Sequence, residues 1–269
     1  MNRYAIKKTK EGLSCLNIGC GGSFHKEWNN LDLFKNEWVN YYDARKPLPY
    51  LENSFDCAYS SHMLEHLSRE KAILHIRDIA KVIKKDGVIR IAVPDLEKIC
   101  EEYLKYLKLS INEPTPVNLQ RYQWIVLELL DQMTREKSGG YMREVLDSGK
   151  TDVEYLKERI GDRAGANSKK RDNQKSNNII VLLKKLKNSF CTFRQKFYDP
   201  RKMGEVHKWM YDRLSLKLLL EEMGFANFSV KKFNESNIKH WDKYNLDASS
   251  SDPNRPRKPD SIYVEAIKK

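Results

Sequence analysis

A glycine-rich turn directly after a short apolar run is the feature that most constrains this chain. The apolar run Leu13–Ile18 is followed by Gly19, Gly21 and Gly22, three glycines within four positions. This pattern predicts a buried parallel strand that ends in a turn whose backbone lies close to another molecule. Glycine lacks a Cβ atom, adopts positive φ and leaves amide N–H groups to face a ligand. The turn alone does not identify that ligand, because its glycines do not follow the dinucleotide-binding spacing.

Strands and helices alternate over the N-terminal part of the chain. Short β-prone segments are expected at 28–33, 38–43, 54–60 and 87–93. An amphipathic helix over 69–85, with Gly87 as its expected stop, separates the last two. This alternation predicts a doubly wound parallel sheet, in which ligands bind at the carboxyl ends of the strands. Three polar side chains fall at such ends: Asp32, Asp43 and Ser60. Together with the glycine turn they predict a binding site along one edge of the sheet.

The chain is expected to contain three segments. Residues 1–109 form the N-terminal, ligand-binding part of an α/β core, and residues 205–269 form its C-terminal part, a helix followed by two strands. Residues 110–204 are predicted to be a helical insertion, or cap, because their apolar residues recur at helical spacing. Residues 234–260, between the last two strands, are rich in Pro, Asn and Ser and are expected to form a wall of the site.

Positive charge is concentrated in the predicted insertion. The chain of 269 residues has a formal net charge of +12, and residues 168–202 carry 11 Lys or Arg against 2 Asp. An apolar stripe along residues 178–197 predicts a basic amphipathic helix. It is interpreted as a solvated face over a core, as a peripheral contact with an anionic membrane or lipid-linked glycan, or as a nucleic-acid site. Nucleic acid is the least favoured, because no RNA-binding module is recognisable.

The composition also bears on the compartment. The chain has neither a run of about 18 apolar residues nor a signal-like N-terminus. Its five cysteines lack pairwise metal-ligand spacing, which indicates reduced, buried thiols. We therefore expect a cytoplasmic protein, which associates with the inner face of the membrane if the basic helix binds lipid. No residue is predicted as a metal ligand, and a metal requirement of the reaction stays open.

Six segments of the chain match a known family in order and at compatible spacings. These are Leu16–Gly22, Asn30–Leu33, Asp43–Tyr50, Ser54–Asp56, Ser60–Leu67 and Ile91–Leu96. With them the chain resembles the class I S-adenosylmethionine-dependent methyltransferases, and more narrowly a bacterial group found among polysaccharide-assembly enzymes. The resemblance extends over residues 13–97 and returns more weakly at 131–133 and 207–212. It implies a seven-stranded, Rossmann-like sheet whose last strand is antiparallel.

The resemblance also implies where S-adenosylmethionine binds. This cofactor carries a sulfonium, an ammonium, a ribose diol and an adenine but no phosphate, so it needs close backbone and carboxylates. Asp32 is expected to accept from the ribose hydroxyls, and Asp43 with the Ala44 amide to contact the adenine. Only 13 residues separate Gly19 from Asp32, so the usual first helix is short or missing, which also argues against a nicotinamide dinucleotide. The expected cofactor-binding residues are Gly19, Cys20, Gly21, Asp32, Leu33, Asp43, Ala44 and Ser60.

Two histidines are candidates for the base that a hydroxyl acceptor requires. His62 follows the fourth expected strand, where acceptors bind in this fold. His207 lies in a cluster with Trp209 and Tyr211 that suits sugar stacking, although the cluster is equally interpreted as an aromatic brace. Arg135 is expected either to contact the acceptor from the cap or to be a solvated helix charge.

The segment from His62 to His66 also matches the H-x-x-E-H pattern of some zinc proteases. That function is disfavoured here, because the segment follows a strand end and no distant third ligand is evident. Glu65 and His66 are instead expected to pack and bond locally, and His75 is expected on the surface of a helix.

The sequence therefore predicts a methyltransferase that moves a methyl group from S-adenosylmethionine to a sugar hydroxyl, in the synthesis of surface polysaccharide or a lipid-linked glycan. Two alternatives stay open. The acceptor is RNA, or the chain is a catalytically inactive cofactor-binding fold that serves as an interaction subunit.

Overall fold

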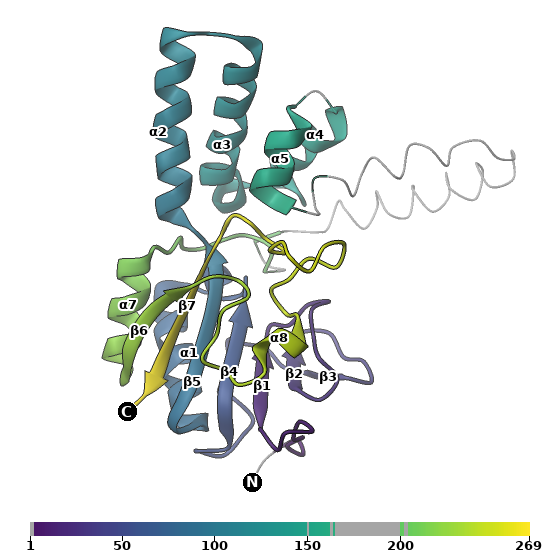
Figure 1. The fold of residues 1–269 in the computed structure, drawn as a ribbon, viewed down its shortest axis with the longest axis vertical. Helices are drawn as coiled ribbons and strands as arrows, with labels where there is room; N and C mark the ends of the chain where they lie inside the picture. The colour runs from purple at the N-terminus through teal and green to yellow at the C-terminus, as the bar shows by residue number, and fades with distance from the viewer. Residues whose placement is uncertain (1–2, 150, 162–163, 165–199, 202–203) are drawn as a thin grey trace, which may run out of the picture. The chain divides into compact units, whose positions relative to one another are not determined.

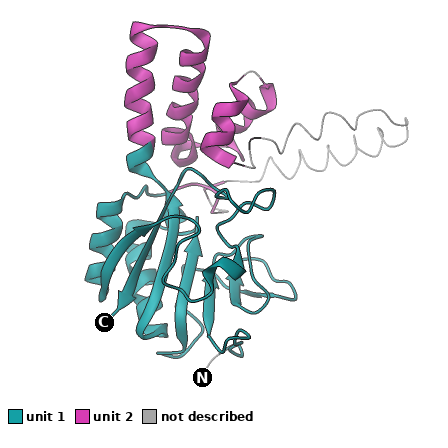
Figure 2. Ribbon diagram, viewed as in Figure 1, with its two compact units in different colours: residues 1–98, 208–269 teal, residues 99–207 magenta. Residues whose placement is uncertain are grey.

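The computed structural model describes residues 3–149, 151–161, 164, 200–201 and 204–269. The chain divides into two compact units, residues 1–98 with 208–269 (unit 1) and residues 99–207 (unit 2) (Figure 2). Each unit has a hydrophobic core of its own. The expected insertion falls within unit 2, and the basic segment 178–197 lies outside the described residues.

Unit 1 is built on one seven-stranded sheet (Figure 1). Its strands are β1 (Cys15–Ile18), β2 (Asn29–Asp32), β3 (Val39–Tyr41), β4 (Phe55–Ser61), β5 (Ile83–Pro94), β6 (Phe225–Lys231) and β7 (Ser261–Lys268). They lie in the order β3-β2-β1-β4-β5-β7-β6. The pairs among β1 to β5 are parallel, whereas β7 is antiparallel to both β5 and β6. The predicted Rossmann-like sheet with an antiparallel last strand is therefore confirmed.

One face of the sheet is covered by two amphipathic helices, α1 (Arg69–Val82) and α7 (Arg213–Glu222). Their buried residues, including Ile76, Ile79 and Leu216, pack in the same core as strand residues of the sheet. The side chain of Ser68 caps α1, and Asp212 forms a capping box at the start of α7. These caps set where each helix begins above the sheet.

The helix expected over residues 69–85 ends earlier, at Val82. The next residue, Ile83, already pairs with Phe55 of β4, and the register of the ladder shifts after this pair. A Cβ atom on Gly87 would lie 2.5 Å from Cγ2 of Ile83. Gly87 is therefore required for close packing beside the irregular part of β5 and does not end the helix.

The other face of the sheet is covered by irregular chain with one short helix, α8 (Trp241–Tyr244), which lies in front of the sheet in Figure 1. Aromatic rings dominate this second core. The ring of Trp28 lies 5.1 Å from that of Tyr244, and the ring of Tyr59 lies 5.3 Å from that of Trp241. The segment 234–260 thus covers a face of the sheet.

A fully buried arginine ties this covering segment to the sheet. Nε of Arg90, in β5, donates to Asp247 at 2.9 Å, and Nη1 donates to Glu265 of β7 at 2.9 Å. The guanidinium also lies 4.4 Å from the ring centre of Trp241. The carbonyl groups that accept its other hydrogen bonds belong to Lys232, Phe233 and Glu235. Arg90 therefore donates hydrogen bonds to backbone carbonyl groups that lie outside the helices and strands.

Unit 2 is helical, as predicted for the insertion. It contains most of α2 (Leu96–Asn112), together with α3 (Pro116–Thr134), α4 (Gly140–Ser148) and α5 (Val153–Ile160). Trp124 is fully buried in its core, where Glu128 and Arg159 form an ion pair at 2.6 Å. Within the described part of the chain, no helix is long and apolar enough to cross a membrane.

His75 is buried in α1, with 2% of its surface exposed, so its expected place on the helix surface is wrong. Burial lowers the pKa of His75 to about 4. In the unfolded chain the imidazole of His75 takes up a proton near the ordinary histidine pKa of about 6.5, whereas in the folded chain it stays neutral at that pH. Protons therefore favour the unfolded state between these values, and stability should fall as the pH drops from about 6.5 to about 4.

This dependence should weaken in a His75→Leu variant. Urea unfolding of both proteins at several pH values between 7 and 4 measures it, with His240→Leu, at an exposed position, as the control. An equal loss of stability with acid in the wild type and in His75→Leu would contradict the assignment.

Candidate active site

The carboxyl ends of β1 and β2 meet at the glycine turn. Gly19 and Gly21 have positive φ, 66° and 51°. The N–H groups of Gly19 and Cys20 donate to the carbonyl of Leu31, at 2.8 and 3.3 Å. The N–H of Gly21 donates to Oδ2 of Asp32 at 2.8 Å. The expectation that these amides face a ligand is therefore wrong, because all three are bonded to the end of β2.

The two glycines at positive φ are constrained differently. A Cβ atom on Gly19 would lie 2.4 Å from Cγ of Met63, whereas one on Gly21 would meet nothing within 4 Å. Gly19 is thus required by internal packing. The turn at Gly21 borders open space, which is where a ligand has room to approach the backbone.

Asp32 ends β2 beside this open space. Its carboxylate accepts from Gly21 and, at 3.4 Å, from the N–H of Phe34, so acceptor positions remain on both oxygens. The neighbouring side chains of Leu33 and Phe34 are 53% and 42% exposed. A carboxylate beside exposed apolar side chains suits a ribose diol that carries a flat aromatic base.

Asp43, shortly after β3, is already paired. Nε and Nη2 of Arg45 donate to its two oxygens at 2.8 and 2.7 Å. The backbone N–H of Arg45 also donates to Oδ1 at 3.0 Å. Hydrogen bonding by the Arg45 side chain lowers the pKa of the Asp43 carboxyl. Asp43 would therefore share its carboxylate between Arg45 and an adenine, while the expected contact by the half-buried Ala44 stays a prediction.

Cys20 and Ser60 have structural contacts in this site. Burial, followed by the charge of Asp32, raises the pKa of the Cys20 thiol to about 12, so the thiol stays neutral. The hydroxyl of Ser60 donates to the carbonyl of Ile18 at 3.1 Å and so ties β4 to β1. Their contact with a cofactor stays a prediction.

The chain between β1 and β2 contains turns and no helix, as the short spacing predicted. Two buried amide side chains hold it instead. Nδ2 of Asn17 donates to the carbonyl of Ser23 at 3.0 Å and to Oδ1 of Asn30 at 3.1 Å. The carbonyl groups that accept from Nδ2 of Asn30 belong to His25, Trp28 and Trp38.

His62 follows β4 in a left-handed backbone conformation, with φ of 52°. Nε2 of its ring lies 2.7 Å from Oγ of Ser261, and Nδ1 lies 3.2 Å from Oε1 of Glu65 in the 3₁₀ turn η1 (Leu64–His66). The side chain of His62 is 8% exposed and that of Glu65 is fully buried. Sequence reasoning expected His62 here but missed Ser261, which is far away in the chain.

The expected wall runs along the ends of β4 and β5. Nη2 of Arg257 lies 3.5 Å from Oγ of Ser61, at the end of β4. The N–H of Asp95, just after β5, donates to the carbonyl of Asp260 at 2.9 Å. The last part of the segment 234–260 therefore borders the same edge as the glycine turn.

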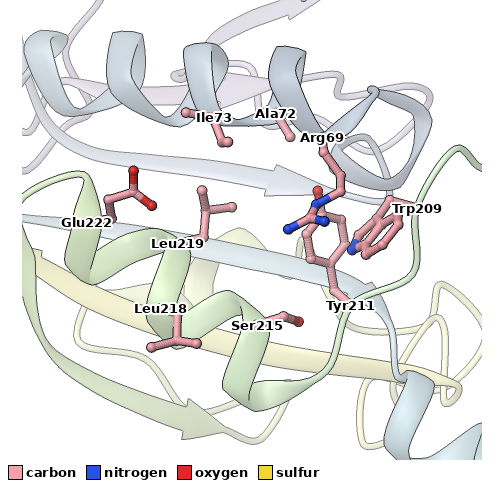
Figure 3. A pocket seen from close by; sticks show the side chains of 9 residues that line it. All are labelled: Arg69, Ala72, Ile73, Trp209, Tyr211, Ser215, Leu218, Leu219 and Glu222. Carbon is pink, nitrogen blue, oxygen red and sulfur yellow. The ribbon is translucent and has the colours of Figure 1, made fainter.

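A hollow of about 200 Å³ lies between α1 and α7 in unit 1 (Figure 3). The guanidinium of Arg69 lies 4.6 Å from the ring centre of Trp209, which is 36% exposed. Tyr211 is buried in the core, and burial raises the pKa of its phenol. This burial fits the aromatic brace better than sugar stacking for Tyr211, and its role toward an acceptor stays a prediction.

The other two candidates belong to unit 2. His207 is buried, and its backbone N–H donates to the backbone carbonyl of Gln132 at 2.9 Å. The side chain of Arg135 is 9% exposed and bonded to Asp131 and Glu205, at 2.8 and 3.0 Å. The interpretation of Arg135 as a solvated charge is therefore wrong. The expected roles of Arg135 and His207 toward an acceptor stay predictions.

Residues 27–91 match the family model for a methyltransferase domain. This stretch contains β2, β3, β4, α1 and most of β5, and with them Asp32, Asp43, Ser60 and His62. The sheet order given above, with β7 antiparallel, is the one that the class I fold requires. Unit 1 therefore contains a stretch that matches a methyltransferase domain, on a sheet with the class I strand order, and we call it the methyltransferase domain. The glycine turn lies just outside the matched stretch of this domain.

Three solved structures are similar to the chain at low identity. A SAM-dependent methyltransferase from Archaeoglobus fulgidus is 16% identical, with 94% of this chain and 85% of that one covered and a TM-score of 0.40. The YcgJ protein from Bacillus subtilis is 12% identical, with 95% of this chain and 91% of that one covered and a TM-score of 0.39. The cyclase SpnF is 21% identical, but only 29% of this chain and 38% of that chain are covered, with a TM-score of 0.25. No curated protein matches the chain.

The residues of the methyltransferase domain fit S-adenosylmethionine. Because the amides of Gly19, Cys20 and Gly21 are occupied, the turn is not a phosphate cradle, which relies on unpaired N–H groups. It offers oxygen atoms instead, above all the carboxylate of Asp32. Acceptors of this kind suit a cofactor that has hydroxyl and cationic groups and no phosphate. Leu33 supplies the exposed apolar surface that an adenine would cover.

Proposed function

We propose that the methyltransferase domain methylates a hydroxyl of a sugar, in the synthesis of surface polysaccharide or a lipid-linked glycan. The observation that supports a hydroxyl acceptor is the imidazole of His62, which lies at the end of β4, with Nδ1 3.2 Å from the buried carboxylate of Glu65. A hydroxyl is a weak nucleophile and needs a base to take its proton as it reacts. The sugar is supported by the residue resemblance and by the partly exposed indole of Trp209.

The residues that would hold the cofactor are Asp32 for the ribose, Leu33 and Asp43 for the adenine, and the turn at Gly21 for the methionine end. When bound, S-adenosylmethionine would supply the methyl group: the acceptor oxygen would bond to the methyl carbon, and the electron pair of the carbon–sulfur bond would stay on sulfur. His62 takes up the proton that the acceptor oxygen loses. The basic segment 178–197 is proposed to place the domain against an anionic membrane or a lipid-linked acceptor.

Titration calorimetry with S-adenosylhomocysteine tests the cofactor assignment. Asp32→Ala and Asp43→Ala should each weaken binding by about 1–3 kcal/mol, or about 5- to 150-fold, because a hydrogen-bond partner of the ligand is lost. Asp242→Ala removes an exposed carboxylate on α8 and should leave the affinity unchanged. Equal affinity in the wild type and in both site variants would contradict the assignment. No binding to the wild type would favour an interaction subunit.

Radiolabelled S-adenosylmethionine tests the acceptor. Incubation with lipid-linked glycan, free polysaccharide and total RNA should label a glycan fraction and leave RNA unlabelled. Labelling confined to RNA, and lost sharply at raised salt, would replace the sugar by a nucleic acid in this proposal.

A further inference from the structure

Three polar side chains from separate parts of the methyltransferase domain form a continuous chain near the carboxyl ends of β4 and β5. Ser261 is the first residue of β7, His62 follows β4, and Glu65 lies in η1. The two contacts of 2.7 and 3.2 Å join Oγ to Nε2 and Nδ1 to Oε1. Ser261 and His62 are 199 residues apart in sequence, so the fold brings them together. In register, Ser261 lies opposite Pro94, at the end of β5.

The distances favour one of the two neutral forms of the His62 ring, although the contact with Glu65 is a distance of 3.2 Å and not a full hydrogen bond. An ionised Glu65 would only accept hydrogen bonds, and the proton of His62 would then lie on Nδ1, the nitrogen that faces Glu65. Nε2 is then the acceptor, and the hydroxyl of Ser261 donates to it. His62 is thereby held in the tautomer that takes up a further proton at Nε2.

The surrounding backbone fixes this arrangement. The left-handed conformation of His62 is strained in a residue with a Cβ atom, and such strain is found at functional sites. The carbonyl of Glu65 accepts from the N–H groups of Lys208 and Trp209, at 2.7 and 3.3 Å. Its side chain is fully buried. The carboxylate therefore has little freedom to turn away from the imidazole.

We propose that Ser261, His62 and Glu65 form a proton relay that takes the proton of an acceptor hydroxyl, an inference that rests on the proposed function. As the acceptor oxygen bonds to the methyl carbon and the carbon–sulfur bond breaks, its proton passes to Oγ of Ser261. The proton of Ser261 passes to Nε2 of His62. The imidazolium formed faces the carboxylate of Glu65 and afterwards releases one proton to water. Ser261 contacts the acceptor, His62 is the base, and Glu65 is a positioning residue.

The same residue types occur in hydrolases, where the serine attacks a carbonyl carbon. That reaction needs N–H donors for the oxyanion. Ser261 lies opposite Pro94, which has no backbone N–H, and it borders a cofactor fold built for methyl transfer. A relay therefore agrees better with its surroundings than a nucleophilic serine.

Other ionisable groups border the relay and are unchanged in the variants used to test it. These groups are His66 in η1, Asp95 after β5, Tyr211 before α7, and Arg257 and Asp260 before β7.

Nuclear magnetic resonance of the full chain labelled with ¹⁵N in its histidine rings tests the relay without an acceptor. His62 should have its proton on Nδ1. Glu65→Gln should lower the pH at which His62 takes up a second proton by about 1 unit or more, because an opposite charge is lost. Ser261→Ala should shift the Nε2 resonance, and Ser261→Thr, which keeps the hydroxyl, should restore it. The affinity for S-adenosylhomocysteine should stay the same in all three variants.

The possible failures are distinguishable. A proton on Nε2 in the wild type, or an unchanged titration in Glu65→Gln, would overturn the relay. Labelling of Ser261 by a fluorophosphonate would overturn it in favour of a nucleophile. If Glu65→Gln does not fold, Glu65→Asp can be used instead, because it keeps the charge. The proton should then stay on Nδ1 of His62, and its absence from Nδ1 would also count against the relay. Failure of the wild type to bind S-adenosylhomocysteine would instead overturn the proposed function.

Discussion

Replacing Arg90 with methionine should lower the free energy of unfolding of the methyltransferase domain by about 3–5 kcal/mol. Methionine fills much of the space of the arginine but donates no hydrogen bond. Asp247 and Glu265, whose side chains are 2% and 0% exposed, would lose their charged partner in the core. Burial already raises the pKa of Asp247 in the presence of Arg90. The carboxylates would therefore be left in a site that disfavours their charge.

Urea unfolding followed by circular dichroism measures this loss. Arg255→Met is the matched control, because Arg255 pairs with Asp252 on the surface and such pairs contribute about 1 kcal/mol or less. The triple variant Arg90→Met, Asp247→Asn, Glu265→Gln removes the unpaired charges and should recover part of the stability. A loss below about 1 kcal/mol for Arg90→Met alone would show that the carboxylates find other partners.

The fold could be predicted from the sequence because its determinants are local. Buried strands such as Phe55–Ser61 are short β-prone runs, and α1 carries its apolar residues on one stripe. The end of α1 was misplaced because Gly87 suggested a helix stop. Its actual role depends on Ile83 and on the neighbouring strand, which local sequence does not reveal.

The site was predicted in part for the same reason. The positions of the glycine turn and Asp32 follow from where strands end. That the amides of the turn are occupied follows from the carbonyl of Leu31 and the carboxylate of Asp32, which are supplied by the neighbouring strand. The pairing of Asp43 with Arg45 is local, and an arginine two residues after an acid was its signal.

The long-range contacts could not be predicted. Arg90 reaches Asp247 and Glu265 across 157 and 175 residues, and the register of β5 on β7 places Glu265 opposite Arg90. A signal was nevertheless present, since Arg90 interrupts the apolar run from Val88 to Pro94 and Glu265 interrupts the run from Ile262 to Ile267. Opposite charges at such positions indicate that the two strands are neighbours.

Replacing His62 with asparagine should lower the rate of methyl transfer by about 10²- to 10⁴-fold, the usual contribution of a general base. Asparagine tolerates the left-handed backbone of this position, so the turn should persist, but its amide does not take up a proton. The affinity for S-adenosylhomocysteine should not change. His240→Asn is the matched control, because His240 is exposed and has φ of 64°. Transfer of radiolabelled methyl groups to the labelled glycan fraction measures the rate.

The same assay separates His62 from the other candidates for proton removal. In the wild type the rate should rise with pH as His62 loses its proton, and this rise should vanish in His62→Asn. His207→Ala is also expected to keep cofactor binding and lose turnover if His207 acts as the base. A rate loss confined to His207→Ala would therefore transfer the role of base to His207 and contradict the assignment to His62. A third outcome would be that a chelator abolishes the activity of the wild type while His62→Asn is fully active. A metal ion bound to the acceptor hydroxyl would then promote loss of its proton, and no imidazole base would be needed.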